Sequence, residues 1–331
     1  MLPKNKIMYS NVSIIMYHYV RDLKHSRYPD IKGIDITLFR EQIEYLKKHY
    51  HFITMEMLID AIDNNSSLPK KSVLLTFDDA YIEHFNFVFP LLNEQKIQGS
   101  FFPPVKAITE HTVLDVNKIH FILASEENKS KIITEIKNEL KKFRKEYNLQ
   151  SDSFYYEKLA QPGRFDSADV IFIKRLLQVE LDEPLRKIIT NNLFEKIVGI
   201  NEDSFSRELY MDIEQIKCLQ RNGMHIGSHG YDHYWLGSLT RENQKIEIEK
   251  SLAFLNQIGC DTKQWTMCYP YGNYNDSTIE LLMEYNCKLA LTTEVNIADI
   301  QKYNKYTLPR LDTNDIPKNS EAATNDWYLK G

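Results

Sequence analysis

The chain has 331 residues, a formal net charge of −5 at pH 7 and a hydrophobic content of 43%, so it can bury a sizeable core in one domain or two. Acidic and basic residues are interspersed without a basic stripe, which argues against nucleic acid as a main partner. The four cysteines form no closely spaced motif, and no run of about 18 apolar residues occurs. The sequence therefore predicts a reduced globular protein with no transmembrane segment.

The N-terminal residues, MLPKNKIMYSN, lack the apolar core of a secretory signal, so we expect a cytoplasmic protein. Residues 12–17 predict a buried first strand that ends at His18. Thr37 is the expected N-cap of the helix that follows. A short strand over 52–54 and a helix over 55–63 come next, an alternation typical of parallel α/β sheets.

The stretch SVLLTFDDAY, at 72–81, contains a nearly continuous apolar run that predicts a strand buried on both faces. The run ends at Asp78 and Asp79, and the carboxyl end of a buried strand is where α/β folds bind ligands. Adjacent carboxylates repel each other unless a cation lies beside them, so one could bind a metal while the other accepts protons. The alternative is that one of them merely caps the next helix.

The alternation of strands and helices is interrupted in the middle of the chain. A helix towards Gln95 is expected to kink or restart at Pro90, and a strand over 99–102 follows. From 111 to 207 the sequence shows helical stripes of apolar residues and no convincing buried strand. We interpret this block as a helical insertion near the carboxyl ends of the strands, where it would form a lid or a substrate wall.

The alternation resumes after the insertion. Asp212 and Gln215 match an N-cap and N3 pair, and Gly223 matches the position after a helix end. The remaining expected elements are strands over 224–227, 265–269, 289–292 and 308–311, and helices after Thr240 and over 276–286. The tail from Thr313 is polar, and we expect it to be loosely held.

Two histidines four residues apart, His229 and His233, follow the strand expected over 224–227 in the stretch MHIGSHGYDHYW. Imidazole suits zinc and similar divalent ions, with a carboxylate as a natural third ligand. A His-x-x-x-His pair alone is usually a coincidence, but this pair and the Asp-Asp pair both lie at strand ends. The set Asp79, His229 and His233 would leave coordination positions open for water and substrate.

Three short motifs, TFDDAY, SHGYDH and YPYG, resemble the first three motifs of the polysaccharide deacetylase family, the NodB-homology domain of carbohydrate esterase family 4. The opening IIMYHYV and the segment 289–293 are also similar to members of that family. The resemblance covers roughly residues 12–105 and 208–315 and leaves the middle unmatched.

The resemblance implies a fold and an activity. The fold is α/β, a distorted (β/α) barrel formed by residues 1–110 and 208–331, with 111–207 as the helical insertion. The activity is metal-dependent hydrolysis of a linear amide C–N bond that removes an acetyl or formyl group from an amino sugar. The substrate would be an N-acylated sugar or a sugar-containing precursor of surface polysaccharide.

The resemblance also implies roles for particular residues. The implied ligands of one divalent ion, zinc with cobalt or nickel as alternatives, are Asp79, His229 and His233. Asp78, beside the metal, would be the general base. The backbone N–H of Tyr271, after Pro270, would stabilise the oxyanion.

The sequence departs from the family pattern at three points. Cys268 stands where an arginine commonly orients the catalytic aspartate, and Gly230 stands where serine or threonine is usual. The late strand, TLPRLDT, lacks the histidine that serves as general acid. Arg310 could replace the arginine and His18 the acid, although an ordinary salt bridge and a hydrogen-bonded core histidine are the simpler interpretations of these two.

Other functions remain open from the sequence. One alternative is an amidohydrolase for a non-sugar amide, or an O-acetyl esterase. Another, of a different class, is a catalytically weak pseudoenzyme that binds glycans. Retention of both Asp78 and Asp79 argues against the last, because a protein that only binds has no need of a base.

Overall fold

The structure is a computed structural model that describes residues 8–331, and its chain divides into two compact units. The first, which we name the sheet unit, comprises the chain up to Asp22 with Gly33–Glu110 and Arg207–Gly331. The second, the helical unit, comprises Leu23–Lys32 and His111–Ser206. The short segment 23–32, which the sequence analysis placed with the barrel, therefore groups with the helical unit.

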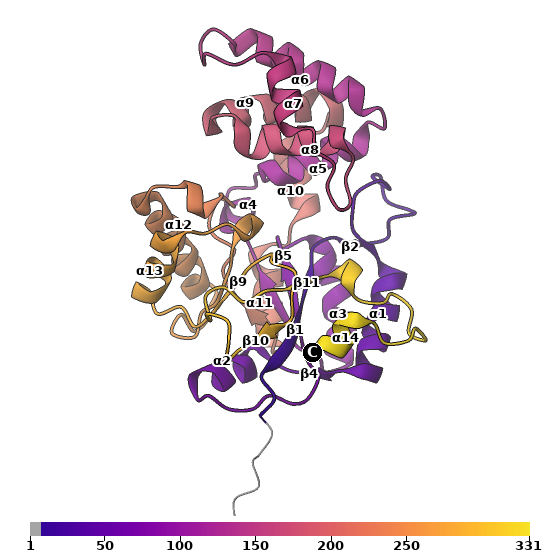
Figure 1. Ribbon diagram of the computed structural model, residues 1–331, viewed down its shortest axis with the longest axis vertical. Coiled ribbons are helices and arrows are strands. Elements are labelled where there is room, and N and C mark those ends of the chain that lie inside the picture. The colour runs from indigo at the N-terminus through magenta and orange to yellow at the C-terminus, as the bar shows by residue number, and fades with distance from the viewer. Residues whose placement is uncertain (1–7) are drawn as a thin grey trace, which may run out of the picture. The chain divides into compact units, whose positions relative to one another are not determined.

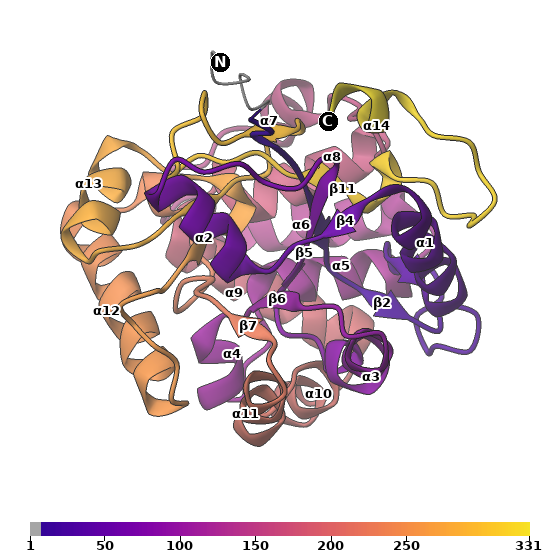
Figure 2. The same cartoon turned by 90° about the horizontal axis from the view of Figure 1, so that it is seen from below.

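The central strand of the sheet unit is β5 (Ser72–Asp78), in which all seven residues are buried. This confirms the strand predicted from the apolar run. Strand β1 (Asn11–Tyr17) pairs parallel with β5 on one side, and β6 (Gly99–Phe102) and the short β4 (His51–Phe52) pair parallel with it on the other. Figure 2 shows these strands surrounded by helices.

Parallel pairing continues from β6 around the sheet unit. The next strands are β7 (His225–Ile226), β8 (Met267–Cys268), β9 (Ala290–Leu291) and β11 (Leu311–Asp312). Isolated bridges join Ser228 to Met267 and Leu291 to Leu308, while β11 pairs with β1. Because Leu308 and β11 belong to one short segment, the pairing returns to the strand where it began. The predicted α/β fold with parallel strands is confirmed, and this closed order of pairing agrees with the distorted barrel that the sequence implied.

Three short strands lie outside this series. Strand β10 (Ala298–Asp299) pairs antiparallel with β1, and β2 (Val20–Arg21) pairs with β3 (Ile34–Asp35). The helices of the sheet unit are α1 (Ile36–His49), α2 (Met55–Asp63), α3 (Phe89–Glu94), α4 (Val105–Thr109), α11 (Ile213–Arg221), α12 (Arg241–Gln257), α13 (Asp276–Glu284) and α14 (Asp326–Lys330).

Helix starts follow capping chemistry, with one correction. The capping box of Asp212 and Gln215 and the N-cap at Thr240 are both confirmed. The N-cap of α1 is Asp35, however, and the prediction of Thr37 was wrong. The Asp35 carboxylate accepts the backbone N–H of Thr37 at 2.9 Å, so the charged acceptor begins the helix two residues earlier.

The helical segment after Asp79 runs past Pro90 but changes its hydrogen-bonding pattern just before it, where the sequence predicted a kink or a restart. A single π-helical turn over His84–Val88 leads into α3, and Pro90 occupies the first turn of α3, where its missing N–H breaks no helical hydrogen bond.

The C-terminal tail is held more firmly than expected. Trp327 and Tyr328 of α14 pack against the hydrophobic core, and the Lys71 ammonium lies 4.3 Å from the Tyr328 ring centroid. The prediction of a loose tail was wrong, because two aromatic side chains anchor a segment whose other residues are mostly polar.

The helical unit contains no strand among its described residues. Its helices are α5 (Asp115–Ser125), α6 (Lys129–Phe143), α7 (Asp152–Leu159), α8 (Ala168–Arg175) and α9 (Glu183–Leu193), and α10 (Glu202–Leu209) runs across the boundary with the sheet unit (Figure 1). The apolar stripe of α6 is buried at Ile132, Ile136 and Leu140. Over residues 8–331, no helix combines the length and hydropathy needed to cross a membrane.

Candidate active site

At the carboxyl end of β5, two neighbouring carboxylates contact different partners. The strand ends at Asp78, and the chain then turns through left-handed backbone conformations at Asp79 (φ 72°) and Ala80 (φ 54°). Such angles are uncommon outside glycine and persist only where the surrounding structure holds them. Asp78 and Asp79 are both buried, at 1% and 2% exposure.

Asp79 faces both histidines of the SHGYDH motif. Its Oδ1 lies 3.4 Å from Nε2 of His229 and 3.4 Å from Nε2 of His233, and it has no hydrogen-bond partner among the described residues. The other oxygen, Oδ2, accepts the Tyr81 hydroxyl at 2.7 Å. One oxygen of Asp79 is therefore fixed, and the other is directed at the two imidazoles.

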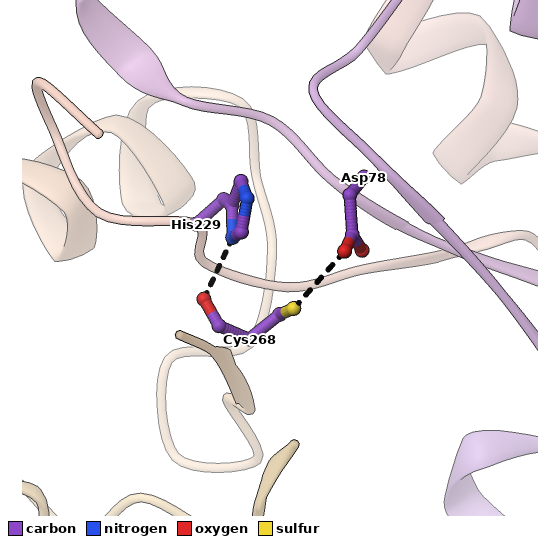
Figure 3. Close-up of side chains that lie close together, drawn as sticks. All are labelled: Asp78, His229 and Cys268. Atoms are coloured by element: carbon purple, nitrogen blue, oxygen red, sulfur yellow. Dashed lines mark hydrogen bonds between the residues drawn. The ribbon is translucent and has the colours of Figure 1, made fainter. Parts of the chain in front are cut away.

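The ring of His229 is oriented by a backbone carbonyl. Its Nδ1 lies 2.7 Å from the carbonyl oxygen of Cys268 (Figure 3). Because a carbonyl oxygen only accepts hydrogen bonds, Nδ1 carries a proton, and Nε2 is the ring nitrogen that faces Asp79. This is the arrangement commonly found behind a metal-binding histidine.

These three side chains fit a divalent metal ion. Their ligand atoms all lie within 4.8 Å of one another, and all three residues are buried. Tetrahedral zinc, with bonds of about 2.0–2.1 Å, spaces its ligand atoms about 3.3–3.4 Å apart. A buried carboxylate also requires a cation or hydrogen bonds, and the unpartnered Oδ1 of Asp79 has its open side towards the imidazoles.

The charges of the cluster shift its pKa values in opposite directions. Burial opposes ionisation of Asp79, but the imidazoles of His229 and His233, each 3.4 Å from its Oδ1, hold the pKa of Asp79 well below its usual value. Burial opposes protonation of His229, yet Cys268, Asp79 and Asp78 raise its pKa well above the usual value. At His233 burial prevails and lowers the pKa. The ionised Asp79 thus attracts positive charge, either a proton on His229 or a metal ion.

Asp78 is paired with an arginine. Nη1 and Nη2 of Arg310 donate to Oδ1 and Oδ2 of Asp78 at 3.0 and 2.8 Å. The thiol of Cys268 donates to Oδ2 at 3.4 Å (Figure 3). Burial raises the pKa of Asp78, but Arg310, His229 and His18 outweigh it and lower the pKa to about 2. Asp78 is therefore ionised throughout the neutral range.

Arg310 is itself fixed at every nitrogen of its guanidinium. Besides Asp78, it donates from Nε to the carbonyl of Thr292 at 2.8 Å and from Nη1 to the hydroxyl of Thr76 at 3.1 Å. Its side chain is fully buried. The structure thus brings Arg310 to the carboxylate that the sequence analysis paired with it.

His18 also lies at this carboxylate. Its Nε2 is 3.8 Å from Oδ2 of Asp78, and 39% of its side chain is exposed. The backbone carbonyl of His18 accepts the Nε2–H of His84 at 2.7 Å, which fixes the chain at that point. His18 is therefore no buried core histidine, and its ring lies between solvent and the Asp78 carboxylate.

Tyr271 and Pro270 lie beside the metal-ligand candidates. Pro270 is buried, and Tyr271 has a left-handed backbone with φ of 58°. The Tyr271 ring centroid is 4.7 Å from that of His233, and the ring stacks on Trp235 at 4.5 Å. The structure therefore places all eight predicted site residues in the sheet unit around one cluster.

Sequence reasoning missed three residues that contact this cluster: Tyr81, Trp235 and Glu247. Tyr81 lies inside the TFDDAY motif, where its spacing two residues after Asp79 was the available signal. Trp235 follows His233 by two residues. Glu247 gave no local signal, because it reaches the site from the middle of α12.

Comparison with known families agrees with this geometry. Residues 195–290 match the family model described as Polysaccharide deacetylase, a span that includes both histidines and Tyr271. The resemblance to polysaccharide deacetylases is confirmed. Members of this family are hydrolases that act on amide C–N bonds of N-acetyl sugars, which is the enzyme class expected from the sequence.

Among curated proteins, the chain is similar to YxkH of Bacillus subtilis (strain 168), which is provisionally described as a polysaccharide deacetylase. The identity is 27% over 108 residues, 33% of this chain. The match spans 38% of the length of YxkH, so it covers well under half of that relative.

Several solved structures share the fold over most of the chain. The deacetylase PplD of Streptococcus pyogenes, in complex with acetate, is 18% identical, with a TM-score of 0.55 over 91% of this chain and 92% of PplD. IcaB from Ammonifex degensii is 18% identical, with a TM-score of 0.54 over 98% of this chain and 96% of IcaB. A de-N-acetylase from Aggregatibacter actinomycetemcomitans is 15% identical, with a TM-score of 0.53 over 95% and 97%.

Proposed function

We propose that the chain is a metal-dependent hydrolase that removes an acetyl or formyl group from the nitrogen of an amino sugar, in a precursor of surface polysaccharide. One observation carries the proposal. The buried Oδ1 of Asp79 has no hydrogen-bond partner among the described residues and faces the Nε2 atoms of His229 and His233. The adjacent carboxylate of Asp78 is held separately by Arg310, so one can bind a cation while the other handles protons.

The residues that would hold the ion are Asp79, His229 and His233, with zinc as the expected metal and cobalt or nickel as alternatives. When bound, such an ion supplies Lewis-acid polarisation and lowers the pKa of water at neutral pH. Tyr81 orients Asp79 and the Cys268 carbonyl orients His229, so two of the three ligands are oriented before an ion arrives.

Asp78 accepts the proton of the attacking water. Arg310 keeps this carboxylate ionised and fixes its orientation through two hydrogen bonds. The backbone N–H of Tyr271 is the proposed donor to the developing oxyanion.

His18 donates a proton to the departing amine. An amide anion is a very poor leaving group, so the tetrahedral intermediate breaks down only when its nitrogen is protonated. Both other histidines of the cluster have Nε2 directed at Asp79, whereas His18 is partly exposed and 3.8 Å from Asp78. It is therefore placed to face a substrate that enters from solvent.

The sugar and the acyl group are proposed from the relatives. PplD is a deacetylase solved with acetate, and the Aggregatibacter protein is a de-N-acetylase. The matching family model is that of polysaccharide deacetylases. These names support an N-acetyl sugar as the first substrate to test.

The decisive experiment measures acetate and formate release from a panel of N-acyl sugars, with O-acetyl sugars and simple amides alongside, before and after treatment with a chelator. Metal content is measured on the same samples. We expect release from N-acyl sugars that disappears with the chelator and returns with zinc or cobalt. Release from O-acetyl sugars only would favour an esterase, and metal binding without release from any substrate would favour a glycan-binding protein.

Two variants separate the ligand role from the base role. His229→Ala should lose metal and activity together, because it removes one of three ligands. Asp78→Asn is nearly isosteric and should retain metal while turnover falls by about 10²-fold or more. Asp276→Asn, an exposed carboxylate in the first turn of α13, is the control and should change neither. Full metal content in His229→Ala, or near-normal turnover in Asp78→Asn, would contradict the assignment.

A further inference from the structure

The short loop between the two histidines, residues 230–232, leaves one of them without its own orienting hydrogen bond. Nδ1 of His229 is anchored on the Cys268 carbonyl, whereas Nδ1 of His233 is buried without a partner among residues 8–331. His233 also has a left-handed backbone, with φ of 55°. Such a conformation persists only when the surroundings impose it, so the position of His233 depends on what holds the loop.

Two of the three N–H groups of the loop are held by a single buried carboxylate, and the third, of Gly230, donates to the Ser228 hydroxyl at 3.2 Å. Oε2 of Glu247, from the middle of α12, accepts the backbone N–H of Tyr231 at 2.9 Å and that of Asp232 at 2.9 Å. Glu247 is 4% exposed. A carboxylate buried this far is costly unless it is hydrogen-bonded, and both of these bonds go to the loop.

The carbonyl groups of the loop are held from the opposite side. The carbonyl of Gly230 accepts the N–H of Val105 at 3.3 Å, and that of Tyr231 accepts the N–H of Lys106 at 2.9 Å. Both donors belong to the first turn of α4, where backbone N–H groups have no helical acceptor. The loop carbonyls are thus held by the backbone of α4, and the loop N–H groups by the side chains of Glu247 and Ser228.

The absence of a side chain at Gly230 leaves space for the Glu247 carboxylate. A Cβ at residue 230 would lie 3.2 Å from Oε2 of Glu247, and the φ of 74° disfavours any side chain there. The sequence has glycine where a serine or threonine hydroxyl is usual in the motif. Here the space beside the loop backbone is occupied by the carboxylate oxygen instead.

We propose that Glu247 is a positioning residue of the metal centre, which holds the 230–232 loop so that Nε2 of His233 faces Asp79. The inference rests on the proposed metal site but not on the identity of the substrate. The hydrogen bonds of Glu247 go to the loop backbone, so Glu247 would act on the metal through His233 and not as a ligand.

The experiment is a titration of purified variants with Zn²⁺ in competition with a chromophoric chelator, together with the visible absorption of the Co²⁺ form. Glu247→Leu should weaken zinc affinity by about 10–100-fold, the range typical for loss of a residue that orients a ligand. Glu247→Gln should remain within about threefold of wild type, because its amide oxygen can still accept both N–H groups. Glu249→Leu is the matched control, since Glu249 lies two residues along the same helix and is exposed.

The outcomes separate this inference from the proposed function. Equal zinc affinity and cobalt absorption in Glu247→Leu and Glu249→Leu would overturn the positioning role while leaving the metal site intact. A wild-type chain that binds no divalent ion would contradict the proposed function itself. If Glu247→Leu fails to fold, hydrogen exchange in the wild type tests the proposal instead. The hydrogen bonds to Glu247 should protect the backbone amides of Tyr231 and Asp232 from exchange. Exchange at the rate of unprotected amides would overturn the proposal.

Discussion

The ion pair of Asp78 and Arg310 controls the charge of the proposed base. Both side chains are buried at 1% exposure, and the pair is joined by two hydrogen bonds. Truncating one member of such a pair leaves an uncompensated buried charge, which costs far more than an exposed salt bridge is worth. The guanidinium is supplied from the residue just before β11 and not from position 268. This is possible because β11 pairs with β1, which pairs in turn with β5, the strand that ends at Asp78.

The first prediction concerns pH. The pKa of Asp78 is lowered to about 2, so ionisation of this group stabilises the fold fully above about pH 4, and that contribution is lost as the pH falls towards 2. In Arg310→Lys the bidentate contact is weakened while burial remains, so the pKa of Asp78 should rise. The acidic limb of kcat/KM against pH should therefore move to higher pH than in wild type.

The control for that measurement is an arginine outside the site. Arg241→Lys replaces a partly exposed arginine that pairs with Glu280 and Glu284, and it should leave the pH profile unchanged. An acidic limb that does not move in Arg310→Lys would show that another group limits the rate at low pH.

The second prediction tests the proposed acid. His18→Gln keeps a polar side chain of similar length but cannot supply a proton, so turnover should fall by about 10²-fold or more while metal content stays at the wild-type level. His51→Gln, an exposed histidine at β4, is the control. Normal turnover in His18→Gln would mean that the leaving nitrogen receives its proton from another group.

At the scale of elements, the site is built where strands end in left-handed turns. Asp79 follows β5 with φ of 72°, His233 follows β7 with φ of 55°, and Tyr271 follows β8 with φ of 58°. None is glycine, so each turn costs free energy that the surrounding contacts must supply. The first two turns place the Asp79 carboxylate 3.4 Å from the His233 imidazole, and the third places the Tyr271 ring 4.7 Å from the His233 ring, centroid to centroid.

The third prediction concerns α14. Tyr328 packs edge-on against Tyr50, with ring centroids 5.3 Å apart, and lies under the Lys71 ammonium. Tyr328→Ala should therefore lower the free energy of unfolding by about 1–3 kcal/mol, the usual range for loss of a partly buried aromatic group. Denaturant unfolding measures the change. Leu329→Ala, at a position that is 69% exposed, should stay within about 0.5 kcal/mol of wild type, and an equal effect of both variants would restore the view of a loose tail.

For the molecule as a whole, the sequence predicted best what local patterns encode. The run ending at Asp78 is a fully buried strand, and the helix over 55–63 has the expected bounds. Strands in the second half of the barrel were expected to be longer, as in 265–269 against the observed Met267–Cys268. Isolated bridges replace continuous ladders there, and apolar runs do not reveal how many of their residues pair.

For the site too, the sequence predicted the residues that local patterns mark and missed those that depend on tertiary contacts. Asp79 and the two histidines are recognisable because their residue types and strand-end positions point to one chemistry. Tyr81 and Glu247 act through hydrogen bonds to Asp79 and to the histidine loop, and such partners depend on tertiary placement. The sequence carries no periodicity or spacing that marks Glu247 apart from other glutamates of an amphipathic helix.

The last prediction uses the division of the chain into two units. Every proposed ligand lies in the sheet unit, and the helical unit has its own buried core from α5, α6, α8 and α9. A ligand that binds only the folded form stabilises what it binds, by about 2.7 kcal/mol at a concentration of 100 Kd. Calorimetry of the metal-free chain with increasing zinc should therefore show a transition of the sheet unit that moves to higher temperature, and a second transition, from the helical unit, that does not.

His229→Ala provides the control for that experiment, because it should abolish the zinc-dependent shift without removing either transition. If both transitions move together with zinc, or if only one transition exists and it moves as a whole, the two units unfold as one cooperative body. In that case metal binding in the sheet unit would stabilise the helices of 111–206 as well, and these helices could not be removed without loss of the metal site's stability.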